Sequence, residues 1–171
     1  MVEMELVDIQ VERTTNIPYI LLRAGDGSGR VLPILTRPPE ADAIKFGMQA
    51  TPMPRPMTHD LLIALLGSCA ASVARVVITE VRSRVFYADL VLSVGGRETT
   101  VSSRPSDAIA IAVRAKAPIF ATAALLDEVG VQPSELLGVE DVGPVEPEEQ
   151  EELVDEFRKF IDDINPEDFG A

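Results

Sequence analysis

Glycine-rich turns between short alternating segments constrain the fold of this chain most strongly. Residues 7–11 alternate apolar and polar side chains, which is the period of a half-buried strand. A second strand-like segment, residues 19–23, is followed by the turn sequence Gly25–Gly29 and then by another apolar segment, residues 30–35. Such a glycine cluster is typical of a hairpin turn. The first part of the chain therefore predicts neighbouring antiparallel strands.

The rest of the chain alternates between helical and strand-like segments. Proline followed by an acid is typical of a helix start, and this pattern occurs at Pro38–Glu40 and at Pro105–Asp107. We expect helices over residues 40–49, 58–66, 105–116 and 123–129, strands over 73–81 and 85–94, a short strand ending at Val101, and a buried apolar run at 118–121. Because hairpins outnumber crossovers, the sequence predicts an α+β fold with a mixed, mainly antiparallel sheet and helices packed on it.

Negative charge is concentrated at the C-terminal end. The chain has a formal net charge of −13. Residues 144–171 hold eleven acids and two bases, which gives −9, whereas residues 1–143 contribute only −4. We therefore expect an α+β domain over 1–143, followed by an acidic linker and an amphipathic helix over 144–171. The apolar stripe of that helix needs a surface to dock on, and its members are Leu153, Val154, Phe157, Phe160, Ile161 and Ile164.

The composition argues against a disulfide, a zinc site, a membrane-spanning helix and a secretory signal. The single Cys69 allows no internal disulfide, and with one histidine the chain lacks a zinc ligand set. Among Leu66, Ala70 and Ala71, Cys69 is expected to be a small buried hydrophobic residue. No run approaches the roughly 20 apolar residues of a membrane helix, and the N-terminus lacks the pattern of a secretory signal. We expect a cytoplasmic protein without a membrane partner.

The most informative motif is an Arg-Pro pair that precedes a helix with an early aspartate. It occurs twice, at residues 55–60 and at residues 104–107. In each copy the arginine stands just before a helix N-terminus, where free backbone N–H groups and the helix dipole favour an anion. Arg55 and Arg104 are therefore candidate ligands for the phosphate of a substrate.

Acid–base and metal chemistry are also available beside these arginines. His59, the only histidine, follows Arg55 closely and titrates near neutral pH, so it is a candidate proton-transfer group. The carboxylates of Glu40, Asp60 and Asp107 are candidate ligands for Mg²⁺ or Mn²⁺, which prefer oxygen donors. Neighbouring residues on a helix point in different directions, so His59 and Asp60 need help from elsewhere to share one site.

A structural role explains the same residues equally simply. Thr58 suits an N-cap, and Asp60 in the first turn of a helix would contribute about 0.3–1 kcal/mol through the helix dipole. Arg104 and Asp107 can pair across a turn. At this point both interpretations stay open.

Five separate pieces of the sequence resemble the bifunctional nuclease (BFN) domain family in order and spacing. They are Leu32-Pro33-Ile34, Glu40-Ala41 with Ala43-Ile44, Arg55–Leu61, Phe86-Tyr87-Ala88 and Ser103–Ala110. The resemblance implies a small α+β domain, often homo-oligomeric, and cleavage of both RNA and DNA has been assigned to some members. Two positions depart from the family, because Arg37 and Arg84 stand where members commonly have glycine, and this restricts the backbone there.

Two functions follow. The first is a nuclease that cleaves RNA or DNA phosphodiester bonds with a divalent metal. Its catalytic residues would be His59, Asp60 and Asp107, its phosphate ligands Arg55 and Arg104, and its metal ligands Glu40, Asp60 and Asp107. The second is a non-catalytic regulatory or scaffold domain that acts through homo-oligomerisation or protein partners, which the near-neutral body and the single histidine favour. A homo-oligomer, with a dimer favoured, is expected in both cases.

Overall fold

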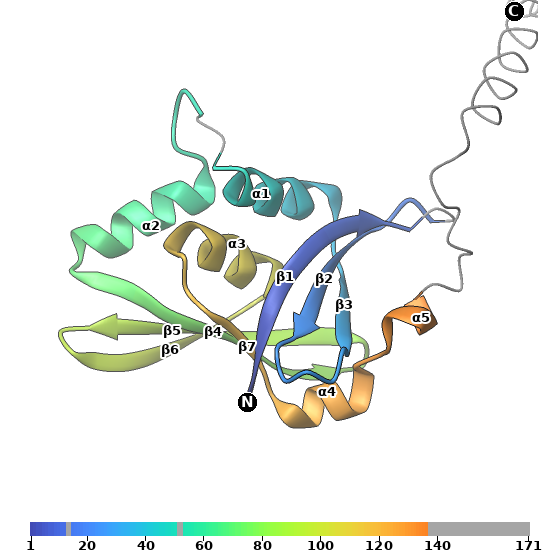
Figure 1. Ribbon diagram of the computed structural model, residues 1–171. Coiled ribbons are helices and arrows are strands. Elements are labelled where there is room, and N and C mark those ends of the chain that lie inside the picture. Colours follow the sequence, from blue (N-terminus) through green and yellow to red (C-terminus); the bar gives the residue numbers. More distant parts are fainter. Residues whose placement is uncertain (13–14, 51–52, 137–171) are drawn as a thin grey trace, which may run out of the picture. The chain divides into compact units, whose positions relative to one another are not determined.

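The computed structural model of the chain describes residues 1–12, 15–50 and 53–136, and a seven-stranded sheet forms its centre (Figure 1). The strand order is β3-β2-β1-β7-β4-β5-β6. The strands are β1 (Val2–Val11), β2 (Pro18–Ala24), β3 (Val31–Leu35), β4 (Ala71–Arg82), β5 (Val85–Val94), β6 (Arg97–Ser103) and β7 (Ile119–Ala121). Every neighbouring pair is antiparallel except β4 and β7. The predicted α+β fold with a mixed, mainly antiparallel sheet is confirmed.

Strand β7 joins two antiparallel halves of the sheet, although it has only three residues. Ile119 lies opposite Met4 of β1 in an antiparallel register and opposite Val76 of β4 in a parallel one. Ile119 and Ala121 are buried, as expected for this apolar run. The sequence did not predict a strand here, because three residues are too few to show a period of two.

Three helices cover one face of the sheet, and a fourth lies on the opposite side (Figure 1). The helices are α1 (Pro38–Met48), α2 (Thr58–Ser68), α3 (Pro105–Ala115), α4 (Ala123–Val129) and α5 (Pro133–Leu136). Helix α3 packs on β4 and β5 and is contacted by both α1 and α2. Its residues 108–112 are all buried, and three of these five are alanines, which allow close approach. Helix α3 is therefore the inner helix of the layer.

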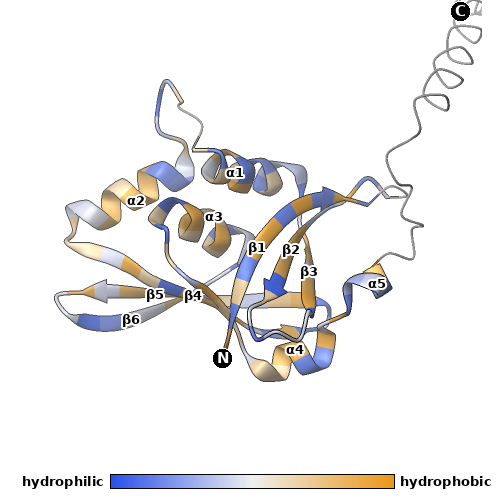
Figure 2. Ribbon diagram, viewed as in Figure 1, coloured by the Kyte–Doolittle hydropathy of each residue, from blue (hydrophilic) through white to orange (hydrophobic). Residues whose placement is uncertain are grey.

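Helix α2 is apolar but peripheral. None of its residues is buried, and Leu61, Leu62 and Leu65 are exposed; Figure 2 shows the hydrophobic colour along this helix. Cys69, which caps its C-terminal end, is exposed as well. The prediction of a buried Cys69 was wrong, because the apolar residues around it belong to a helix that packs only along one side.

The compact unit of the chain runs from Met1 to Glu135. The expected domain end at residue 143, the acidic linker and the amphipathic helix at 144–171 lie outside the described residues. Within residues 1–12, 15–50 and 53–136, no helix combines the length and the apolar character that crossing a bilayer requires.

The turn between β4 and β5 places two non-glycine residues in a backbone conformation that favours glycine. Arg82 pairs with Val85, so Ser83 and Arg84 form a two-residue hairpin loop. Their φ angles are 48° and 66°, which makes this a loop of the type that favours glycine. Arg37, the other position where relatives commonly have glycine, has an ordinary φ of −104°. Of the two positions at which family members commonly have glycine, Arg84 is therefore the one with a conformational cost.

We predict that Arg84→Gly stabilises the domain by up to about 1 kcal/mol, because glycine adopts the left-handed backbone without a steric penalty. Urea unfolding followed by circular dichroism measures the change. The control is Arg97→Gly at an exposed position of β6, which should lower the free energy of unfolding by about 0.5–1 kcal/mol. A destabilised Arg84→Gly variant would contradict the strained conformation of this turn.

Candidate active site

Three acids occupy the same position on three different helices. Each helix has its N-cap three residues before the acid, so that each acid is the third helical residue, near the positive end of the helix dipole. The pairs of N-cap and acid are Arg37 and Glu40 of α1, Met57 and Asp60 of α2, and Arg104 and Asp107 of α3. Thr58, which suited an N-cap, is instead the first residue of α2. These helix starts position the candidate site.

Arg104 joins α1 to α3. Its Nε donates to Asp107 Oδ2 at 2.6 Å and its Nη2 to Asp107 Oδ1 at 2.9 Å, so this pair is bidentate. Its Nη1 donates to Glu40 Oε1 at 2.9 Å. The hydrogen bonds that Arg104 donates to Asp107, and to a smaller extent the one that it donates to Glu40, raise the pKa of its guanidinium. The predicted pairing of Arg104 with Asp107 is therefore present, and Glu40 extends it.

His59 brings α2 to the same place. Its Nε2 lies 3.5 Å from Asp107 Oδ1, at the outer limit of a hydrogen bond, and its side chain is only 12% exposed. Because Asp107 also holds Arg104, one carboxylate contacts an imidazole and a guanidinium. The structure thus brings together four of the predicted site residues, Glu40, His59, Arg104 and Asp107.

Glu40 has one oxygen in use and one without a partner. Its Oε1 accepts hydrogen bonds from Arg37 at 2.7 Å and from Arg104 at 2.9 Å. Its Oε2 is buried, and it is the one buried side-chain polar atom without a partner within the described part of the chain. The Arg37 guanidinium, more than any other group, holds the pKa of Glu40 below its ordinary value. A buried carboxylate oxygen of an ionised group is rarely left unpaired, so this atom marks the site as unusual.

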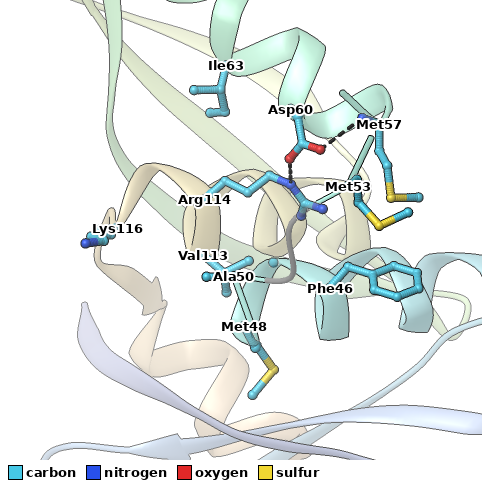
Figure 3. Close-up of a pocket in the computed structure, with 11 residues that line it drawn as sticks. Phe46, Met48, Ala50, Met53, Met57, Asp60, Ile63, Val113, Arg114 and Lys116 are labelled. Atoms are coloured by element: carbon cyan, nitrogen blue, oxygen red, sulfur yellow. Dashed lines mark hydrogen bonds and ion pairs between the residues drawn. The ribbon is translucent and has the colours of Figure 1, made fainter. Parts of the chain in front are cut away.

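Asp60 points away from that cluster. Its Oδ1 accepts from Arg114 Nε at 2.5 Å, and its Oδ2 accepts from the backbone N–H of Met57 at 2.9 Å (Figure 3). Arg114, near the end of α3, was not singled out by the sequence. It follows Asp107 by seven residues, which is two helical turns, so the helical spacing was the available signal.

Arg55 also lies apart from the cluster. It is exposed in the loop before α2, and it forms no ion pair with residues 1–12, 15–50 or 53–136. Of the two predicted phosphate ligands, only Arg104 therefore contacts the acids of the site.

The carboxylates do not fit a divalent cation in this arrangement. Both oxygens of Asp107 and one oxygen of Glu40 already hold Arg104, while Asp60 holds Arg114. Among the described residues, no group of three or more His, Cys, Asp or Glu side chains is placed to hold a metal ion. A Mg²⁺ or Mn²⁺ ion would have to compete with a guanidinium for the same oxygens, so the metal stays a prediction.

Comparison with known proteins identifies relatives of the whole chain and of its central part. A family model described as the bifunctional nuclease domain matches residues 20–134, which confirms the resemblance found in the sequence. An uncharacterized protein of Mycobacterium tuberculosis is 37% identical over 169 residues, which cover 99% of this chain and 98% of that protein. Bifunctional nuclease 1 of Arabidopsis thaliana is 34% identical over 105 residues, and bifunctional nuclease 1 of Oryza sativa subsp. japonica is 33% identical over 103 residues. The matched segment covers 32% and 31% of these two plant proteins and 60% and 58% of this chain.

We predict that Asp60→Asn lowers the free energy of unfolding by about 1.5–3 kcal/mol at neutral pH, because it removes the charge that faces Arg114, whose side chain is 9% exposed. The hydrogen bond from Arg114 lowers the pKa of Asp60 below its ordinary 3.8. The stabilisation is therefore present above that value and is lost as the pH falls through the lowered one. Urea unfolding at pH values from about 7 to about 2 should show the stability difference between the two proteins shrinking at the acid end.

The matched control is Glu5→Gln, which breaks the exposed ion pair with Arg23 and should cost less than about 1 kcal/mol. A stability difference between the wild type and Asp60→Asn that stays constant down to acid pH would show that the Asp60 charge is not what stabilises the fold.

Proposed function

We propose that this chain, which belongs to the bifunctional nuclease domain family, cleaves phosphodiester bonds of RNA or DNA. The observation that supports this most is the meeting of His59, Asp107 and Arg104 at the starts of α2 and α3. A proton-transfer group, a carboxylate that orients it and a guanidinium for phosphate are the components of phosphodiester hydrolysis. The names of the plant relatives point in the same direction.

Arg104 is the proposed phosphate ligand. A guanidinium has five N–H donors, and Arg104 uses three of them for Asp107 and Glu40, which leaves two. Its side chain is 59% exposed, so a phosphate can reach the remaining donors. Arg37, 75% exposed and bound to the same Glu40 oxygen, supplies a second guanidinium nearby. Two arginines suit the two non-bridging oxygens of a phosphodiester.

His59 is the proposed proton-transfer residue. Its Nε2 faces Asp107, so Nδ1 is the nitrogen left to exchange a proton with water or with the leaving oxygen. Asp107 orients the ring through its contact with Nε2. Asp60 positions α2 through Arg114 and Met57, and it acts on the site only through His59, its neighbour in the chain.

The proposed mechanism assigns no step to a divalent metal, and experiment must decide whether cleavage needs one. Mg²⁺ or Mn²⁺ would supply charge at the phosphate if Arg104 released Glu40 and Asp107. The roles given to His59 and Arg104 do not depend on it. The cytoplasmic location likewise stays a prediction from the sequence.

A second candidate function is a non-catalytic scaffold that assembles through α2. This helix exposes Leu61, Leu62 and Leu65, and its ionisable residues, His59 and Asp60, lie only in its first turn. Two identical acidic chains repel each other least where they meet through an uncharged apolar face. We therefore propose that a second copy of the chain covers α2, in a dimer that is compatible with either function.

We predict that the purified chain cleaves single-stranded RNA or DNA and that His59→Ala lowers kcat by about 10²–10⁴-fold, the usual contribution of a positioned proton-transfer group. Gel assays with end-labelled oligonucleotides measure the rate. Arg23→Ala, a change at an exposed strand arginine far from the helix starts, is the control and should leave the rate unchanged. Activity that persists unchanged in a His59→Ala, Asp107→Ala double variant would mean that a contaminant cleaves the substrate.

The same assay with EDTA decides the role of the metal. Loss of cleavage in EDTA with recovery in Mg²⁺ or Mn²⁺ would support the predicted cofactor. Full activity in EDTA would remove it from the mechanism.

We predict that replacing Leu61 and Leu65 together by Glu converts the dimer into a monomer, because a charged face cannot be buried against its own copy. Light scattering after size exclusion measures the mass. Leu35→Glu is the matched control, since Leu35 is 67% exposed on the edge strand β3, and it should leave the mass unchanged. A monomeric wild type would end the proposal of assembly through α2.

A further inference from the structure

A cavity of about 510 Å³ opens between α1, α2 and α3 (Figure 3). Its size lies in the range of about 300–1,000 Å³ that is usual for small-molecule sites. Its lining is mainly apolar and includes Phe46, Met57, Ile63 and Val113, and its charged groups are the ion pair of Asp60 with Arg114 and the ammonium of Lys116. Apolar walls with few polar groups are typical of a binding site.

The ion pair presents both a donor and an acceptor to the cavity. Arg114 donates from Nε to Asp60 and from Nη1 to the carbonyl oxygens of Ala43 and Ala110, both at 2.9 Å. These bonds leave Nη2 available. The two oxygens of Asp60 accept one bond each, and a carboxylate can accept more. A neutral ligand with donors and acceptors along one edge therefore suits this pair better than an ion of either sign.

The apolar walls suit a flat aromatic ring. Thioether sulfur and an aromatic side chain both make favourable contacts with ring systems, and Met57 and Phe46 provide them. Gly47 keeps the space open, because a Cβ at this position would lie 2.6 Å from Arg114 Nη1 and 2.6 Å from Val113 Cγ2. The missing side chain at Gly47 thus allows Arg114 to form part of the cavity wall.

The cavity and the candidate active site share the same three helices. His59 and Asp60 are consecutive, and the first faces Asp107 while the second faces Arg114. Asp107 and Arg114 are seven residues apart on α3, which corresponds to roughly 10 Å along the helix. A phosphate bound at Arg104 and a ring bound in the cavity can therefore belong to the same nucleic-acid strand.

We propose that this cavity binds a nucleobase of the strand whose phosphate lies at Arg104. The inference rests on the proposed nuclease function for the identity of the ligand. The base lies against Met57 and Phe46, and its polar edge faces Asp60 and Arg114.

The methionines of the chain provide a direct test. Of the five, Met48, Met53 and Met57 line the cavity, whereas Met1 and Met4 belong to the N-terminal end of the sheet. The experiment records NMR spectra of the full chain with carbon-13-labelled methionine methyl groups, during titration with nucleoside 5′-monophosphates. We expect the three cavity methyl signals to shift in a saturable way and the two others to stay in place. Inorganic phosphate and ribose 5-phosphate should not shift the three cavity signals.

A filled-cavity variant supplies the second measurement. Ile63→Phe places a larger side chain in the cavity and should weaken nucleotide binding by at least about tenfold. Leu35→Phe, at an exposed position of β3 outside the cavity lining, should bind as the wild type does. Unshifted cavity methyl signals with saturating nucleotide would overturn the proposal, and so would equal shifts with ribose 5-phosphate or with a simple fatty acid alone.

The base site and the nuclease activity are tested independently of each other. A nucleoside monophosphate contains no internucleotide bond, so its binding can be measured whether or not the chain cleaves nucleic acid. Cavity shifts in a protein without nuclease activity would retain the base site and remove the proposed reaction. Cleavage without cavity shifts would retain the reaction and remove the base site.

Discussion

The burial of α3 between the sheet and two other helices is the constraint on which the rest of the site depends. Its alanines and isoleucines, residues 108–112, are fully enclosed, so neither end of the helix can move without disturbing the core. The first end carries Arg104 and Asp107, and the last turn carries Arg114. The polar groups of both the candidate active site and the cavity are therefore held on one rigid element, as a precise site requires.

Helix α2 connects these two places through consecutive residues. His59 joins the cluster at the start of α3, and Asp60 joins Arg114 near its end. Helix α2 buries none of its residues fully, so these polar contacts add to the packing of Ile63 and Leu66 against the core in holding its position. Consecutive residues of one helix therefore contact both places.

Much of the fold followed from the sequence, because its helices and hairpins have strong local signals. The helix at 123–129 and the turn after residue 94 needed only capping and glycine patterns. Strand β7 was not predicted, because its pairing with β1 and β4 depends on residues distant in the sequence. Cys69 was predicted to be buried, because nothing in the local sequence shows that α2 is peripheral. The sequence could place Glu40, Asp60 and Asp107 in the first turns of their helices. It could not show where each side chain points, because that depends on the arginine that it contacts. Arg114 was missed because its partner, Asp60, is distant in the sequence.

A crystal structure of the full chain with an uncleavable dinucleotide would test whether phosphate binding and base binding share the helices around α3. We predict a phosphate oxygen within about 3 Å of an Arg104 guanidinium nitrogen, and one base between Phe46 and Met57 with its edge at Asp60 and Arg114. A dinucleotide bound on another face, with Arg104 still engaged only by Glu40 and Asp107, would contradict it.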